Sequence, residues 1–416
     1  MYKIKPLALL FFAILIAHSV YSQNNTNSPY TRFGFGDISD TNNGEQRAMG
    51  GVSIGARNST GINAVNPASY SSVDSMTFMF DLGASALMSH FSDSRGGVTK
   101  ANGNLEYLTL QFPITKWLGF SAGALPYSFV GYNFYNNDTT YLNNLSSRDT
   151  IPCTKSFIGD GGFSQVYMGF SANLFKHVSL GVNAYYMFGT INNYRDLTST
   201  LSGFTSTSES NTLKANNFRF RYGVQFYNTF DKKHDVTLGL IYESKTTLKG
   251  SFKKTLSGVL VEPIDSSSNF ETPQIFGLGL YYTYNKSLSI GVDYSLQQWN
   301  DVKFNSDNTG SLGNRSKLSI GLDFMPNPFG RKYSDHVHYR AGYNISDSYF
   351  NVYGQNLPKN YGFSVGIGLP LKNSSTVLNA SLEYGKIGSL DLLKEDFYKL
   401  TFNFTFNEHW FFKRKL

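Results

Sequence analysis

One pattern recurs after residue 75: about ten residues in which apolar and polar side chains alternate, followed by turn residues. In the last such segment the apolar side chains stand at 398, 400, 402, 404 and 406, and the polar ones between them. Because successive side chains of a β-strand point to opposite faces, each strand has one apolar and one polar face. A length near ten residues also matches the 9–11 tilted residues that cross a bilayer. The pattern therefore predicts transmembrane strands.

The chain contains about fourteen such segments, and the connections between them alternate in length. Short turns on one side and long polar connections on the other are typical of outer-membrane barrels, whereas soluble β-sandwiches have shorter strands and lack this asymmetry. We therefore expect an all-β fold, a transmembrane antiparallel β-barrel over 76–407. With both chain ends in the periplasm, the short turns are periplasmic. The predicted strands lie near 76–88, 104–112, 117–130, 163–175, 178–190, 216–230, 235–248, 273–284, 287–299, 314–325, 336–347, 360–371, 376–385 and 397–407, and the long loops near 131–162, 191–215, 249–272 and 300–313.

Composition excludes several other classes of protein. Aromatic residues make up 16% of the chain and charged residues only 16%, against about 25% charged in soluble proteins. The mean hydropathy of -0.26 argues against a bundle of membrane helices. The single cysteine, Cys153, excludes a disulfide framework and a thiolate metal site. The net charge of +7 is dispersed apart from a short basic tail, so nucleic acid is not an expected partner.

The first residues have the features of a secretory signal peptide. Lys3 and Lys5 precede an apolar run from Leu7 to Ala17, and small residues follow as far as Ser22. The run is shorter than the roughly 20 apolar residues of a membrane anchor. We expect residues 1–22 to be removed before Gln23, and the mature chain to reside in the outer membrane of a Gram-negative bacterium.

Residues 23–75 do not alternate and are too many for a simple leader into the first strand. A barrel of fourteen strands is too wide for its own side chains to fill, since filling is complete near eight strands. A folded N-terminal hatch, or plug, in the lumen accounts for both observations. The alternative is a disordered periplasmic tail, which the Gly-aromatic and Asn-Pro pairs of this segment disfavour. A basic-aromatic tail, 408–416, follows the last strand.

Within the hatch, a Met-Gly-Gly stretch, a run of small residues and Asn-Pro-Ala precede the barrel. In this order they resemble the FadL-like long-chain fatty acid transporters (OmpP1-type) and the secretion-associated barrels of Bacteroidota that share their fold. The similarity in architecture covers nearly the whole mature chain, but only Arg47–Tyr70 is similar at the level of motifs. The resemblance implies that Asn-Pro-Ala lies at the junction of hatch and barrel. The hatch residues concerned are Arg47, Met49, Gly50, Gly51, Asn66, Pro67 and Ala68.

Proline interrupts the third predicted strand at Pro126. Proline cannot donate a ladder hydrogen bond, so a closed barrel must break or bend there, and Gly123 would ease the bend. In the family resembled, a kink in this strand opens a lateral gap through which hydrophobic substrate leaves into the bilayer. The alternative is that 126–130 already lie above the membrane, where proline is harmless.

No enzyme signature is present, and neither a cofactor nor a metal is expected. The alternation places His336 and His338 on the inner face beside a turn, with no third ligand in sight. Other charges predicted to face the lumen balance one another, which favours salt bridges that hold the hatch rather than an ion-selective pore. These charges are Asp81, Arg219, Arg221, Glu243, Asp293, Lys317, Asp323, Arg340, Glu383 and Lys399.

Two classes of function remain. The first, implied by the resemblance, is passive uptake of hydrophobic small molecules through a hatch-gated barrel with a lateral exit. The second is a plugged barrel that serves as accessory subunit of an outer-membrane secretion or protein-assembly complex, docking through 131–162, 191–215 and the tail Lys413–Lys415. Outer-membrane lipid is a partner in both. The candidate ligand path consists of Phe33, Phe35, Met49, Ile54 and Ile62.

Overall fold

The computed structural model describes residues 25–144, 147–201, 205–257, 264–304, 312–352, 354–371 and 375–409. The expected signal peptide and the tail Lys413–Lys415 lie outside these residues.

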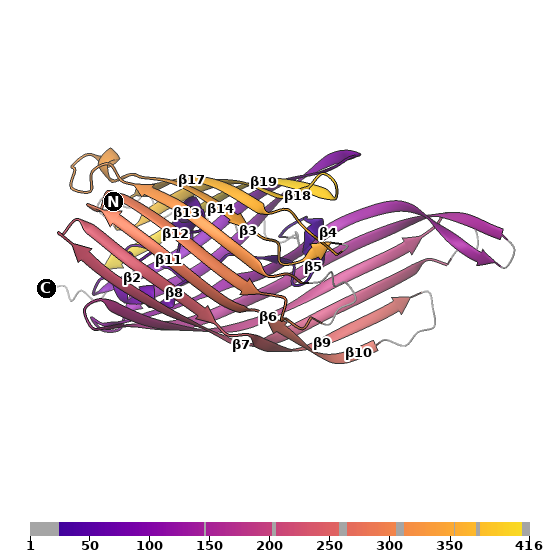
Figure 1. The fold of residues 1–416 in the computed structure, drawn as a ribbon, viewed down its shortest axis with the longest axis horizontal. Coiled ribbons are helices and arrows are strands. Elements are labelled where there is room, and N and C mark those ends of the chain that lie inside the picture. Colours follow the sequence, from indigo (N-terminus) through magenta and orange to yellow (C-terminus); the bar gives the residue numbers. More distant parts are fainter. Residues whose placement is uncertain are drawn as a thin grey trace, which may run out of the picture.

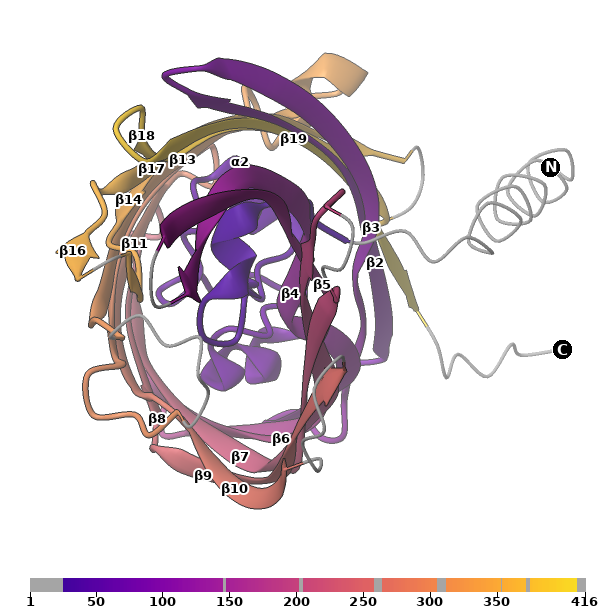
Figure 2. The same ribbon diagram turned by 90° about the vertical axis from the view of Figure 1, so that its right-hand side faces the viewer.

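Fourteen antiparallel strands form a closed barrel, which confirms the predicted fold class (Figures 1 and 2). Each strand pairs with its neighbours, and the last pairs with the first to close the ring. The strands are β2 (Thr77–Asp93), β3 (Gly96–Pro113), β4 (Leu118–Asn144), β5 (Ser147–Leu174), β6 (Val178–Thr198), β7 (Thr207–Phe230), β8 (His234–Glu243), β11 (Gln274–Tyr284), β12 (Leu288–Gln298), β13 (Arg315–Phe324), β14 (His338–Ser346), β17 (Asn360–Pro370), β18 (Val377–Ser389) and β19 (Leu393–His409).

The alternation of the sequence becomes the two faces of the wall. In β19, Phe402 is 51% exposed on the outside, while its neighbours Thr401 and Asn403 are buried on the lumen side. The same division into an exposed apolar and a buried polar face recurs along the other strands. The exterior is therefore an apolar belt, as expected for lipid contact. Among the described residues, no helix is long and apolar enough to cross a membrane.

The long connections differ from the prediction of polar loops. Most of 131–162 continues β4 and β5 as one paired hairpin, and most of 191–215 continues β6 and β7. Within 249–272, β9 (Thr246–Ser257) pairs with both β7 and β10 (Ile264–Thr272). Strand pairing satisfies the backbone hydrogen bonds of these polar stretches, so they extend one side of the wall well beyond the rest (Figure 1).

The chain from 25 to 76, here called the luminal segment, lies inside the ring of strands (Figure 2). It contains the short elements η1 (Pro29–Arg32), β1 (Asp37–Ile38), α2 (Gly44–Ala48) and η2 (Pro67–Ser72). Near its start, the Ser28 hydroxyl donates to Glu395 at 2.6 Å, and Glu395 pairs with Phe91 close to the long-connection ends of β19 and β2. From there the segment descends through the lumen before entering β2.

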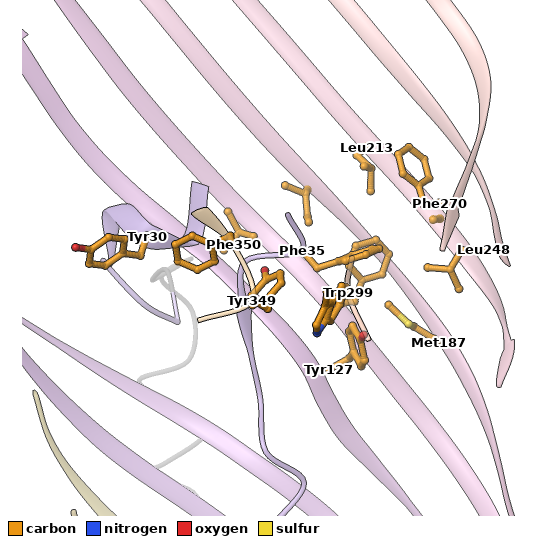
Figure 3. Close-up of a cluster of buried hydrophobic side chains, with 14 of the residues drawn as sticks. Tyr30, Phe35, Tyr127, Met187, Leu213, Leu248, Phe270, Trp299, Tyr349 and Phe350 are labelled. Carbon is orange, nitrogen blue, oxygen red and sulfur yellow. The ribbon is translucent and has the colours of Figure 1, made fainter. Parts of the chain in front are cut away.

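Three smaller elements lie in connections: η3 (Tyr333–His336), β15 (Asn351–Val352) and β16 (Gln355–Asn356). The largest buried apolar cluster joins the luminal segment to the upper wall around Phe35 (Figure 3).

Candidate functional site

The helix α2 is anchored to the wall at both ends. Asn43 caps it by accepting from the Gln46 amide at 2.9 Å, and the Gly44 amide donates to the Tyr107 hydroxyl at 3.0 Å. Arg47 forms an ion pair of 2.8 Å with Glu106, a carboxylate whose side chain is fully buried. Lys399 approaches the other oxygen of Glu106 at 2.6 Å. This network fixes α2 to β3 and β19.

The Met-Gly-Gly stretch follows α2 and lies directly against the wall. Gly50 has a φ of +69°, and a Cβ there would lie 2.7 Å from the Tyr343 amide nitrogen. Its own amide donates to the Ser364 hydroxyl at 2.9 Å. Glycine is needed here because the backbone is left-handed and touches β14.

The Asn-Pro-Ala stretch is the most enclosed part of the luminal segment. Asn66 is fully buried, donates to the Ile54 carbonyl at 2.7 Å and accepts from the Ala68 amide at 3.1 Å. The carbonyl of Ala68 accepts from the hydroxyls of Ser171 and Ser179 at 2.8 and 2.6 Å. Pro67 begins η2, which packs on β5 and β6 and ends shortly before β2.

Charged wall residues bind the luminal segment, in agreement with the predicted inward orientation. Asp293 accepts from the amides of Ser53 and Ile54 at 2.6 and 2.7 Å. Arg340 lies 3.9 Å from Glu45, and Lys317 pairs with Asp40. A buried cluster of Arg219, Arg221 and Glu243 supports the Val65 carbonyl, to which Arg221 donates at 3.4 Å.

Asp40 of the luminal segment lies beside two cations of β13, Lys317 and Arg315. Burial raises the pKa of this carboxyl, but the positive charges of Lys317 and Arg315 outweigh burial. Its pKa therefore lies below the ordinary value of an aspartate, and the carboxylate is ionised at neutral pH.

The pairing between β3 and β4 is incomplete. These strands pair only from Pro113↔Gly119 to Leu108↔Ala124, with Gly123 opposite Thr109. Beyond that point β3 pairs with β2 alone, and β4 pairs with β5. A register shift follows at once: Pro126 and Ser128 oppose consecutive residues of β5, so Tyr127 is a bulge.

The luminal segment pairs with the part of β4 that β3 leaves unpaired. β1 pairs antiparallel with β4, Asp37 opposite Phe129 and Ile38 opposite Ser128. Ser39 donates its amide to the Tyr127 carbonyl at 2.9 Å. One turn earlier, the Thr31 hydroxyl accepts from the Gly131 amide at 3.1 Å. These contacts satisfy backbone groups that β3 would pair in an uninterrupted barrel.

The candidate ligand-path residues do not share one cavity. Phe35 is fully buried and packs edge-on against Phe163 and Phe304, while Phe33 stacks on Phe350 (Figure 3 shows Phe35 and Phe350). Met49, Ile54 and Ile62 are also buried but lie outside that cluster, nearer the short turns.

A cavity beside the luminal segment is lined by both charged and apolar side chains. This cavity of about 210 Å³ lies between the segment and the wall from β13 to β19. Its lining includes Asp40, Arg47, Lys317, Glu383 and Lys399. The same lining also contains Ile38, Leu87, Phe129, Phe350 and Phe397, so it offers apolar as well as charged contacts.

Within the described ranges, no group of three or more His, Cys, Asp or Glu residues could hold a metal ion. His338 faces the lumen and bonds to Asp323 at 2.9 Å. His336, predicted on the same strand face, instead lies in η3, because the preceding turn extends further than expected; it contacts the Gly330 carbonyl at 3.0 Å.

Sequence reasoning missed Glu106 and Tyr127. Both are bulge residues, and a local break in the alternation of apolar and polar residues is the one feature of the sequence that indicates the bulges.

A family model described as BamG matches residues 3–416. No curated protein matches the chain. Among solved structures, the toluene transporter TodX of P. putida is 17% identical with a TM-score of 0.60, covering 89% of this chain and 99% of its own. The toluene transporter TbuX of Ralstonia pickettii is 15% identical with a TM-score of 0.59 and the same coverage. A Pseudomonas aeruginosa FadL homologue is 14% identical with a TM-score of 0.59, covering 90% of this chain and 99% of its own.

The similarity to these solved structures is one of fold, and it agrees with the expected FadL-like architecture. The family model that matches the chain carries a different name, BamG. The closed barrel with its apolar exterior is a protein of the Gram-negative outer membrane.

Proposed function

Because the chain belongs to the BamG family and folds like hydrocarbon channels, we propose that it admits hydrophobic small molecules passively, with the luminal segment as gate and the gap beside Pro126 as exit. The observation that carries this proposal is the separation of β3 from β4 above Leu108, covered by the luminal segment instead of by strand pairing.

The apolar cluster around Phe35 adjoins this gap. Phe35 packs edge-on against Tyr127, the bulge residue, with ring centroids 6.2 Å apart. A hydrophobic molecule that entered the cluster from the long-connection side would therefore meet the gap next. Phe33 and Phe35 would form the first part of the path, and Met49, Ile54 and Ile62 would contact ligand only after the segment moves.

A reversible lock tests this route. Ile38 and Ser128 face each other across β1 and β4, so Ile38→Cys with Ser128→Cys should form a disulfide, in a Cys153→Ser background. We expect oxidation to lower toluene uptake into cells or vesicles at least tenfold, and a reductant to restore it. The control pair is Ser319→Cys with Asn344→Cys, which joins two strands that are already paired. Full uptake through the oxidised Ile38–Ser128 lock would refute the lateral route.

A second candidate is an accessory subunit of an outer-membrane complex. It is favoured by the luminal segment, which buried ion pairs and hydrogen bonds hold against the wall, and by the β4–β7 wall that projects beyond the belt. The docking surfaces would be the upper parts of these strands, at 131–162 and 191–215, and the tail Lys413–Lys415. Purification from native membranes in mild detergent separates the two. Stoichiometric partner proteins together with unchanged toluene uptake after deletion of the gene would favour the subunit.

A further inference from the structure

Exposed cations mark the short turns along one continuous arc of the barrel. The arc comprises the turns β3–β4, β5–β6, β7–β8, β11–β12 and β13–β14. No described ion pair involves any of these cations, and all are exposed. They are Lys116, Lys176, Lys232, Lys233, Lys286, Arg331 and Lys332, here called the basic rim.

The turns of the basic rim are joined to one another by backbone hydrogen bonds. Asn173 donates to the Trp117 carbonyl at 2.8 Å, and Tyr227 donates to the His177 carbonyl at 2.9 Å. Further along, Asn285 donates to the Lys233 carbonyl at 2.6 Å. The cations are therefore held at one level on a continuous edge rather than on independent loops.

Two of these turns place lysine where the backbone favours glycine. Asp231 and Lys232 have φ values of 48° and 58°, and Asn285 and Lys286 have 50° and 58°. Two successive left-handed residues make a type I′ turn, whose second position is usually glycine. Lysine at that position is unfavourable for the turn itself, so its presence indicates a role for the charge.

Every cation of the basic rim except Lys233 stands within two residues of an exposed aromatic side chain. Trp117 follows Lys116, and Phe175, which is 90% exposed, precedes Lys176. Phe230 and Tyr284 precede Lys232 and Lys286 on the outward face of their strands, in continuation of the lipid-facing belt. Aromatic rings at this level lie at the boundary of hydrocarbon and headgroups, and adjacent lysines extend toward the headgroups.

At the opposite end of the barrel, several cations form ion pairs within the protein. The ion pairs there include Arg95–Asp93, Lys155–Asp138, Lys245–Glu271, Lys359–Asp347 and Lys394–Asp396. The charge of the basic rim, which no described ion pair neutralises, is therefore available to an external anion at the short-turn edge.

We propose that the basic rim binds the phosphates of anionic phospholipids in the leaflet that faces the short turns. An acidic protein would require a patch separate from the lipid-facing belt, whereas these cations continue that belt around the edge. Each lysine near an anionic surface adds to the attraction, so the arc gives selectivity over zwitterionic lipid. The inference goes beyond the proposed function and does not depend on what the barrel conducts.

The test compares two variants that lose the same charge. The rim variant carries Lys176→Gln, Lys232→Gln, Lys233→Gln and Lys286→Gln. The control variant carries Lys100→Gln, Lys214→Gln, Lys249→Gln and Lys253→Gln, all exposed at the other end. The purified barrel in neutral detergent is titrated with phosphatidylglycerol or phosphatidylcholine of matched acyl chains, and bound lipid is counted by native mass spectrometry. Unchanged circular dichroism and heat-modifiable migration show that each variant is folded.

We expect the wild-type and control proteins to bind phosphatidylglycerol at least tenfold more tightly than phosphatidylcholine, and the rim variant to lose this preference. A rim variant that keeps the preference, or a control that loses it equally, would overturn the proposal. So would displacement of phosphatidylglycerol by equimolar inorganic phosphate, which would identify a simple anion site. Loss of a copurifying acidic protein with lipid binding unchanged would also overturn it.

Discussion

Arg47 of the luminal segment and Glu106 of the wall form a buried ion pair of 2.8 Å between residues far apart in the sequence. Glu106 also holds Lys399, so one carboxylate joins α2, β3 and β19. If the luminal segment closes the barrel, this pair is a principal restraint on its opening.

We predict that Arg47→Gln destabilises the closed arrangement by about 3 to 5 kcal/mol. The reason is that the buried carboxylate of Glu106 would keep only one of its two positively charged partners, Lys399. Conductance in planar bilayers should rise, and the melting temperature in detergent should fall. Arg95→Gln is the matched control, since Arg95 forms an exposed pair with Asp93 and such pairs contribute about 0 to 1 kcal/mol. Equal effects of the two substitutions would contradict the assigned role of Arg47.

The alternation of the sequence predicts the barrel but fails where a strand gains a residue. Leu110 and Leu108 are predicted to face lipid, so strict alternation predicts that Glu106 also faces lipid. Glu106 is accordingly absent from the charges predicted to face the lumen. In the structure Gly83 opposes Tyr107 and Ala84 opposes Leu105, so Glu106 is the extra residue and turns inward. A bulge reverses the parity of all residues beyond it, and one sequence does not reveal where the partner strand lacks a residue.

The long connections were mispredicted for a related reason. A segment with polar side chains at every position shows no alternation and is therefore predicted to be a loop. A strand that has water on both faces, however, needs no apolar face. Pairing between β4 and β5 as far as Asn144 and Ser147 depends on the backbone rather than on side-chain alternation.

Gly36 controls how closely the luminal segment approaches β4. Its φ is +88°, and a Cβ there would lie 2.3 Å from the Phe129 carbonyl oxygen. We predict that Gly36→Ala separates β1 from β4 and raises exchange of the Ser39 amide with deuterium at least tenfold. Gly354→Ala serves as control, because Gly354 also has a left-handed φ of +77° but open space around it. Unchanged protection of Ser39 in Gly36→Ala would show that the close approach is dispensable.

Phe35 fills the space that a hydrophobic ligand would need. It is fully buried against Tyr127, Phe163, Trp299 and Phe304, and Phe35→Ala should cost about 3 to 5 kcal/mol because it leaves an apolar cavity. Toluene should recover part of this loss by occupying the cavity, which a toluene-dependent rise in melting temperature would reveal. The exposed Tyr135, altered to Ala, should show neither effect. A variant that melts as the wild type does would place Phe35 outside the structural core.

The pair of Asp40 with Lys317 makes closure of the luminal segment dependent on pH. The pKa of Asp40 in the folded protein lies below that of an unfolded aspartate, about 4. The stabilising contribution is therefore complete above about pH 4 and is lost as the pH falls through the lower, folded value. We predict that planar-bilayer conductance is low at pH 7 and rises when the pH drops below about 3. Asp40→Asn should conduct more at pH 7 and respond less to acid, since the variant has no carboxylate to protonate there.

Asp74→Asn, at an exposed position near the start of β2, should keep the wild-type response. If Asp40→Asn retains the full acid response, groups other than Asp40 govern it, and the Asp40–Lys317 pair is not the restraint that acid releases.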